Sequence, residues 1–111
     1  MVRQGDIIKV SLDPQKGHEQ AGYRPAVIVS NDLFNQKTNL AIICPITNTN
    51  NRFPLHVPLD GKTQTTGVIL CEHIRSLDLN ARPYSIIERL PDSILEKVLN
   101  IIFAEVEKEI E

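Results

Sequence analysis

The sequence has 111 residues, the usual length of one domain, and we expect a single domain over residues 1–111. Hydrophobic residues make up 41% and charged residues 23%, as in ordinary globular proteins, and no apolar run approaches the roughly 18 residues of a membrane span. The net charge of −2 argues against an obligate nucleic-acid binder. However, residues 1–89 carry ten Lys/Arg against eight Asp/Glu, a mildly basic balance that is compatible with a short anionic ligand.

Short apolar segments at close spacing predict a series of β-strands. The predicted strands cover residues 6–12, 26–29, 40–44, 55–57, 66–71, 74–79 and 84–89. Residues 6–12 alternate between apolar and polar side chains, which indicates a half-buried strand. Ser30-Asn31-Asp32 offers cap chemistry for a short helical turn over residues 33–35, and we place Pro45 at the edge or exit of the third strand.

The pattern changes after Leu90-Pro91, where apolar residues recur at steps of three and four from Ile94 to Val106. Pro91 and Asp92 suit the start of a helix. The sequence therefore predicts a mainly β fold, a sandwich or small barrel, with one C-terminal α-helix packed on it.

Cys44 and Cys71 each end an apolar run, where a buried free thiol is expected. With two cysteines, no CxxC motif and no paired-histidine spacing, we expect no metal site and no cofactor. The N-terminal residues contain no apolar segment like that of a secretory signal, so the expected location is the cytoplasm, without a membrane.

The stretch over residues 17–30, GHEQAGYRPAVIVS, brings reactive side chains together. Pro25 disfavours the helical conformation for Arg24, so its guanidinium is expected at the extended start of a strand. Gly22 permits a bend that would fold the preceding polar side chains back towards this cation. Those side chains are His18, Glu19 and Gln20.

Three segments together resemble the MazF/PemK (Kid) family of toxin endoribonucleases, and the resemblance covers nearly the whole chain. They are GDIIKVSLDPQKGHEQAGYRPAVIVS at residues 5–30, CPITN at residues 44–48 and TTGVILCEHIRSLDLNAR at residues 65–82. The GxEQxGxRPxxxxS pattern and the PxT pattern are specific in combination, whereas either alone would be weak.

The resemblance implies an SH3-like small barrel with a terminal helix, the fold of the CcdB/MazF/Kid plasmid-maintenance toxins, assembled as a homodimer. It also implies a toxin of a toxin–antitoxin pair, an mRNA interferase that inhibits translation by cutting single-stranded RNA at specific sequences without a metal. The implied partner is a MazE-like antitoxin, whose disordered, acidic tail would compete for the same mildly basic groove.

By motif position, the family's essential arginine falls on Arg24, its threonine on Thr47 and its loop glutamate on Glu19, while His18 matches the histidine of the plasmid-type branch. In that branch a second arginine and an aspartate follow the TTG segment, where this chain has Leu70 and Glu72. An acid/base pair built on that second arginine therefore does not transfer.

Metal-free cleavage by attack of the 2′-hydroxyl, giving a 2′,3′-cyclic phosphate, requires a base, a cation for the phosphorane charge and a proton source. Arg24 suits the cationic role because its planar fork matches phosphate oxygens. Thr47 would donate its hydroxyl to a phosphate oxygen, and Glu19 or His18 would be the base, with Glu19 preferred. The alternatives are a surface salt bridge between Arg24 and Glu19 and a plain strand-end hydroxyl at Thr47.

Further polar and aromatic residues are expected to bind RNA by stacking or by hydrogen bonds to base edges. They are Gln20, Tyr23, Asn48, Arg52, Phe53, His56, Glu72 and Arg75. As alternatives, Tyr23 and Phe53 are partly buried rim residues, and His56 is an ordinary solvated strand residue.

Two other functions compete with RNA cleavage. One is a non-enzymatic gyrase poison of the CcdB type, which uses a C-terminal end containing tryptophan, whereas this chain contains no tryptophan. The other is an SH3-like binding module, which the five aromatic residues of the chain support poorly because proline-rich ligands need aromatic-lined grooves.

Overall fold

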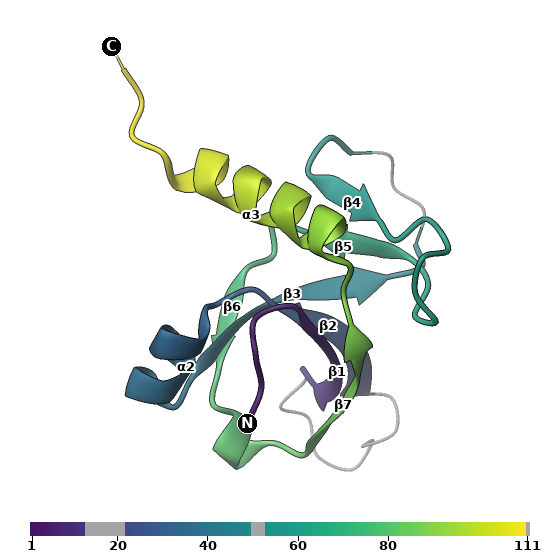
Figure 1. Ribbon diagram of the computed structural model, residues 1–111, viewed down its shortest axis with the longest axis vertical. Coiled ribbons are helices and arrows are strands. Elements are labelled where there is room, and N and C mark those ends of the chain that lie inside the picture. The colour runs from purple at the N-terminus through teal and green to yellow at the C-terminus, as the bar shows by residue number, and fades with distance from the viewer. Residues whose placement is uncertain (13–21, 50–52, 111) are drawn as a thin grey trace.

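The computed structural model describes residues 1–12, 22–49 and 53–110 (Figure 1). Its strands are β1 (Asp6–Ser11), β2 (Tyr23–Ile28), β3 (Ala41–Thr47), β4 (His56–Pro58), β5 (Val68–Leu70), β6 (Arg75–Leu77) and β7 (Tyr84–Arg89). Its helices are α2 (Asp32–Thr38) and α3 (Asp92–Val106), with a 3-10 turn, η1 (Leu79–Ala81). The predicted mainly β fold with a C-terminal helix is confirmed.

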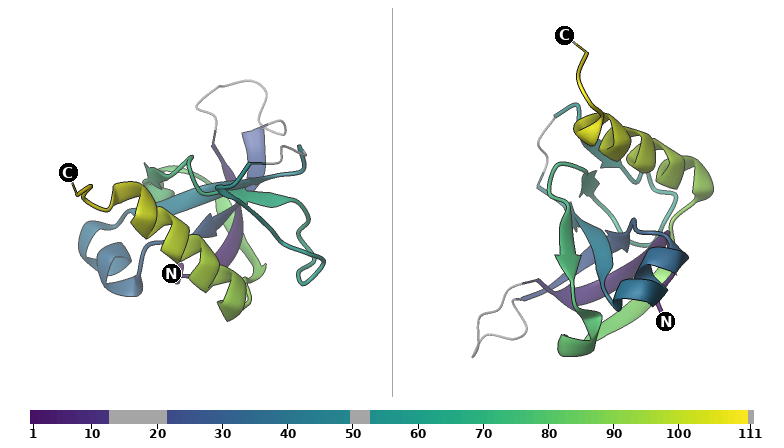
Figure 2. Two further views of the ribbon diagram at one scale, coloured as in Figure 1. Left: turned by 90° about the horizontal axis from the view of Figure 1, so that it is seen from above. Right: turned by 90° about the vertical axis from the view of Figure 1, so that its left-hand side faces the viewer.

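The described strands form one antiparallel sheet in the order β4-β5-β3-β2-β1-β7, and β6 pairs with the beginning of β3. The sheet curves strongly, and α3 lies across one side of it, as the two views of Figure 2 show. Among the described residues no ladder joins the end strands β4 and β7, so the predicted barrel is present as a curved, open sheet. No described helix is long and apolar enough to cross a membrane.

Side chains of the central strands alternate between two apolar clusters, one on each face of the sheet. Ile7 and Val27 belong to the cluster that includes Val98 of α3, whereas Ile8 and Val10 belong to the cluster on the other face. The N-terminal part of β1 is therefore buried on both faces, because α3 covers the side that the alternation alone left exposed. The prediction of a half-buried strand was wrong in this respect.

Local chemistry explains where α2 begins and ends. The side chain of Asn31 accepts a hydrogen bond of 2.8 Å from the Phe34 N–H and caps the helix, as predicted. At the other end Asn39 adopts a left-handed conformation with φ of 59°. These caps support a helix of seven residues, longer than the turn predicted over residues 33–35.

Pro45 lies inside β3 and not at its edge or exit. On one side β3 pairs with β6 through residues 41–43 and then with β5 through residues 46–47. Pro45 falls between these two pairings, where a missing N–H interrupts neither ladder.

Both cysteines are buried free thiols, as predicted. Burial raises the pKa of Cys71 to about 12, with the negative charge of Glu105 adding to the effect, and burial also raises the pKa of Cys44. The thiolate is the reactive form, so we expect iodoacetamide at pH 8 to leave both thiols unmodified in the folded protein and to modify both in denaturant. Mass spectrometry after timed quenching measures this, and equal rates in the two conditions would contradict it.

Candidate active site

Arg24 and Thr47 lie on neighbouring strands at one rim of the sheet. β2 and β3 pair through Ala26 and Pro45, and extending this register by two residues places Thr47 opposite Arg24. Thr47 in turn pairs with Val68 of β5. Because side chains alternate along a strand, Arg24 and Thr47 share one face of the sheet. Their sequence positions are 23 residues apart, and only the strand order brings them together.

The two side chains have groups available for a ligand. Arg24 is exposed and has no ion-pair partner among the residues that the structure describes. The hydroxyl oxygen of Thr47 accepts a hydrogen bond of 3.2 Å from the Thr49 N–H, so its own hydrogen remains to be donated. The ends of these neighbouring strands thus offer a cation and a hydroxyl donor, two groups suited to phosphate oxygens.

A second cluster lies on β4 and just after β5. His56 Nε2 is 2.8 Å from a Glu72 oxygen, and the Phe53 ring packs edge-on against the imidazole with centroids 5.2 Å apart. Burial opposes ionisation of Glu72, but its bond to His56 and the charges of His56 and His73 outweigh this and lower its pKa below the usual 4.5. The His56 side chain is only 7% exposed, which leaves it little surface for RNA.

Glu72 also faces the terminal helix. Burial and the charge of Glu72 raise the pKa of Glu105 on α3, and each of these carboxyl groups has one buried oxygen without a hydrogen bond within the described part of the chain. Glu72 is thus held among His56 and charged neighbours. This is a different setting from a carboxylate paired with an arginine, in agreement with the departure noted from the plasmid-type pattern.

The end of β3 is clamped by the segment that precedes β5. Gly67 has φ of +119°, and a Cβ on it would lie 2.3 Å from the Thr47 carbonyl oxygen, so a residue with a side chain does not fit there. The Thr66 hydroxyl donates a hydrogen bond of 3.0 Å to Asn48 Oδ1. The backbone at Thr47 and Asn48 therefore has a fixed neighbour on its β5 side.

A groove of about 410 Å³ opens on the other face of the same rim. It is lined by Lys9, Pro25, Asn48, Gln64, Thr65, Thr66 and Ile87. Of these, only Asn48 was predicted as a site residue. For residues 64–67, the only local sequence feature that could have indicated a site was the TTG segment, in which a glycine directly precedes an apolar run. Lys9 and Ile87 could not be identified from the local sequence, because they reach the groove only through strand pairing.

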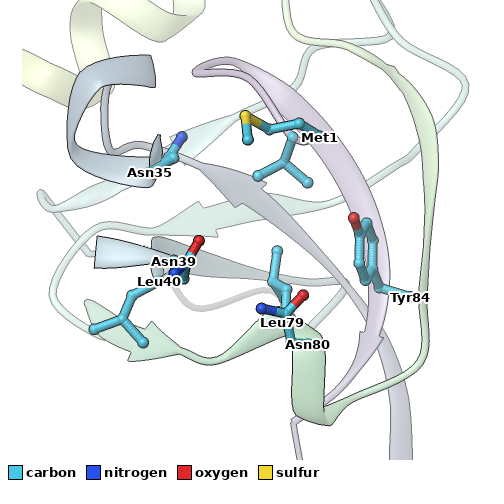
Figure 3. Close-up of a pocket in the computed structure, with 8 residues that line it drawn as sticks. Met1, Asn35, Asn39, Leu40, Leu79, Asn80 and Tyr84 are labelled. Carbon is cyan, nitrogen blue, oxygen red and sulfur yellow. The ribbon is translucent and has the colours of Figure 1, made fainter. Parts of the chain in front are cut away.

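A second hollow of about 290 Å³ lies between the N-terminus, α2, η1 and β7 (Figure 3). Its lining consists of Met1, Val2, Asn35, Asn39, Leu40, Leu79, Asn80 and Tyr84. None of these side chains is charged. The described part of the chain contains no group of three His, Cys, Asp or Glu residues that could hold a metal ion.

The predicted site residues fall into four sets, of which the cluster of Phe53, His56 and Glu72 has been described above. Tyr23, which is 40% exposed, and Asn48 lie at the rim with Arg24 and Thr47. Arg75 pairs with Ile43, four residues and about 13 Å along β3 from Thr47, so the structure does not bring it to the rim. The predictions for His18, Glu19, Gln20 and Arg52 lie outside the described residues.

Comparisons with known proteins agree with this fold. A family model for the PemK-like, MazF-like toxin of type II toxin-antitoxin systems matches residues 3–104. The chain is 41% identical over 102 residues to the endoribonuclease PemK of Escherichia coli, covering 88% of this chain and 77% of that protein. It is also 41% identical over 78 residues to the endoribonuclease toxin MazF of Escherichia coli K12, covering 70% and 69%. A crystal structure of MazE-MazF from Deinococcus radiodurans superposes with a TM-score of 0.85 at 28% identity, covering 97% of this chain and 98% of the other.

Proposed function

Because the chain belongs to the PemK-like, MazF-like toxins of type II toxin-antitoxin systems, we propose that it is an endoribonuclease that cuts single-stranded RNA at specific sequences without a metal. One observation carries the site assignment. The register of β2 and β3, extended by two residues beyond the pair Ala26–Pro45, would set Arg24 opposite Thr47, and this supports a phosphate site between them. The names of the relatives favour this activity over a gyrase poison.

The proposed reaction is a transfer within the RNA. The 2′-oxygen loses its proton to a base and bonds to phosphorus, while the bond from phosphorus to the 5′-oxygen breaks and that oxygen gains a proton. The products are a 2′,3′-cyclic phosphate and a free 5′-hydroxyl. Arg24 neutralises the charge that develops on the phosphorane oxygens, and Thr47 donates a hydrogen bond to one of them. Glu19 or His18 is the proposed base, by motif position alone.

The proposed partners follow from the same family membership. The Deinococcus structure is of a MazE-MazF complex, and we infer that a similar antitoxin inhibits this toxin in the cytoplasm. An acidic antitoxin segment would compete with RNA for the cations of the rim, Arg24 and Lys9. A homodimer and the absence of a cofactor are parts of the same proposal.

The test is to incubate the purified protein with a long single-stranded RNA in EDTA and to map the ends of the fragments. We expect discrete cuts with cyclic phosphate ends, and we expect Thr47→Ala, purified in parallel, to cut at least about tenfold more slowly because one donor to the phosphorane is lost. Thr38→Ala, which removes an exposed hydroxyl on α2, is the matched control and should cut at the parental rate.

Two results would count against the proposal. Intact RNA after incubation with a folded protein would refute the proposed activity. Cleavage by Thr47→Ala at the parental rate would refute the assignment of the site to the rim. Sedimentation at micromolar concentration tests the dimer separately, because a monomer mass contradicts it whatever the RNA result.

A further inference from the structure

Glu88 of β7 joins two parts of the molecule that no ladder connects. One of its oxygens accepts hydrogen bonds from the Thr65 N–H and the Thr65 hydroxyl, both at 2.8 Å, and the other accepts from the Gln64 N–H at 3.1 Å. We refer to Glu88, Gln64 and Thr65 as the Glu88 clasp. The clasp ties the β7 end of the open sheet to the segment between β4 and β5.

The hydrogen bonds around Glu88 favour the ionised form of its carboxyl group. Burial alone would raise the pKa of Glu88, but the hydrogen bonds from Thr65 and Gln64 outweigh it, and the pKa lies below the usual 4.5. A carboxylate that accepts three such bonds holds its partners more firmly than a neutral acceptor would. The segment at residues 64–65 is therefore anchored at neutral pH.

From the clasp the contacts continue directly to the end of β3. Thr66, next to Thr65, donates its hydroxyl to Asn48, and Gly67 lies against the Thr47 carbonyl too closely for any side chain. Two independent features thus transmit the position of this segment to Thr47 and Asn48. Thr63 adds an internal bond of 2.6 Å from its hydroxyl to the Thr65 carbonyl, which stiffens the segment further.

We propose that Glu88 is a positioning residue for RNA cleavage: it touches no substrate, but through residues 64–67 it sets the geometry of Thr47 and Asn48 at the catalytic rim. The proposal rests on the proposed function of that rim. A misplacement of a catalytic group by about 1 Å costs up to about 100-fold in rate, so loosening such a segment has a kinetic effect out of proportion to its effect on stability.

The variant that tests this is Glu88→Gln, in which an NH₂ group replaces one acceptor and faces an N–H that it cannot bond. We expect kcat to fall about tenfold, because the hydroxyl of Thr47 is displaced from the reacting phosphate. Thr66→Val, which removes the hydroxyl bonded to Asn48, should lower kcat in the same way, and the double variant should be no worse than the more affected single one.

Two controls separate positioning from general damage. Glu96→Gln removes an exposed carboxylate on α3, and Ser30→Ala removes a buried hydroxyl that bonds Asn35 away from the rim. Both should retain the parental kcat per folded molecule, even though Ser30→Ala lowers stability. A loss of kcat in Glu88→Gln no larger than in Ser30→Ala would overturn the proposal.

A readout without RNA distinguishes failure of this proposal from failure of the proposed function. The side-chain amide signals of Asn48 in a ¹⁵N–¹H spectrum should shift in Glu88→Gln and in Thr66→Val and stay in place in Glu96→Gln. If they do not move in Glu88→Gln, the positioning role is refuted even where the protein cuts RNA. If they move and the parental protein does not cut RNA, the coupling stands and the proposed function fails.

Discussion

Replacing Arg24 by alanine is expected to lower the rate of RNA cleavage by at least about 100-fold while leaving the protein folded. The guanidinium is exposed at the start of β2 and makes no described ion pair, so its loss costs little stability. Its loss is severe for the reaction, because the phosphorane charge loses the bidentate cation proposed to neutralise it. Single-turnover cleavage of an RNA with one mapped site measures the effect.

Two companion variants sharpen the result. Arg24→Lys retains the charge but loses the planar fork, and we expect it to recover only part of the rate because a lysine cannot bond two phosphate oxygens in parallel. Lys97→Ala removes an exposed cation on α3 and should cut at the parental rate. Parental activity in Arg24→Ala would show that the register argument has placed the site wrongly.

Replacing Gly67 by alanine is expected to impair both stability and cleavage. The backbone of Gly67 has φ of +119°, and the added Cβ would lie 2.3 Å from the carbonyl oxygen of Thr47 and 2.8 Å from its carbonyl carbon, so β5 must move away from β3. We expect a loss of about 3 kcal/mol or more in the free energy of unfolding, measured by denaturant titration at fixed protein concentration. The remaining folded protein should cut RNA more slowly, since Thr47 moves with the strand.

Gly61 supplies the matched control for this substitution. It also has a positive φ, +69°, but a Cβ there would meet nothing within 4 Å. Gly61→Ala should therefore show the conformational cost alone, about 1 kcal/mol, with cleavage unchanged. Equal losses for the two glycines would mean that the approach to Thr47 contributes nothing.

Parts of the fold that depend on local chemistry could be predicted from the sequence. The helix over residues 92–106 follows from apolar spacing and from Pro91 at its start, and the strand at residues 6–11 from alternation. Other features depend on partners distant in sequence. β2 begins at Tyr23, before the apolar run, because Tyr23 pairs with Ser11 of β1. Pro45 lies within β3 because two different strands share that side of it.

The candidate site divides in the same way. Arg24 and Thr47 were identified by motif, but that they face each other depends on the strand order, which no local pattern contains. The bond between His56 and Glu72 joins residues on either side of a turn and was not foreseen. Glu88 had no signal at all, because it is one charged residue in a strand and its partners lie more than 20 residues earlier in the chain.

The pairing of β1 with β7 determines when the sheet can be completed during synthesis of the chain. Asp6 pairs with Arg89 and Val10 with Tyr84, so one of the first strands to leave the ribosome waits for one of the last before its second edge is covered. At about 5–20 residues per second, residues 11–84 take several seconds to be made. Glu88 belongs to that late strand, and the rim therefore acquires its clasp only when most of the chain exists. A nascent copy of the chain thus stays incomplete for most of the time that its own message is being read.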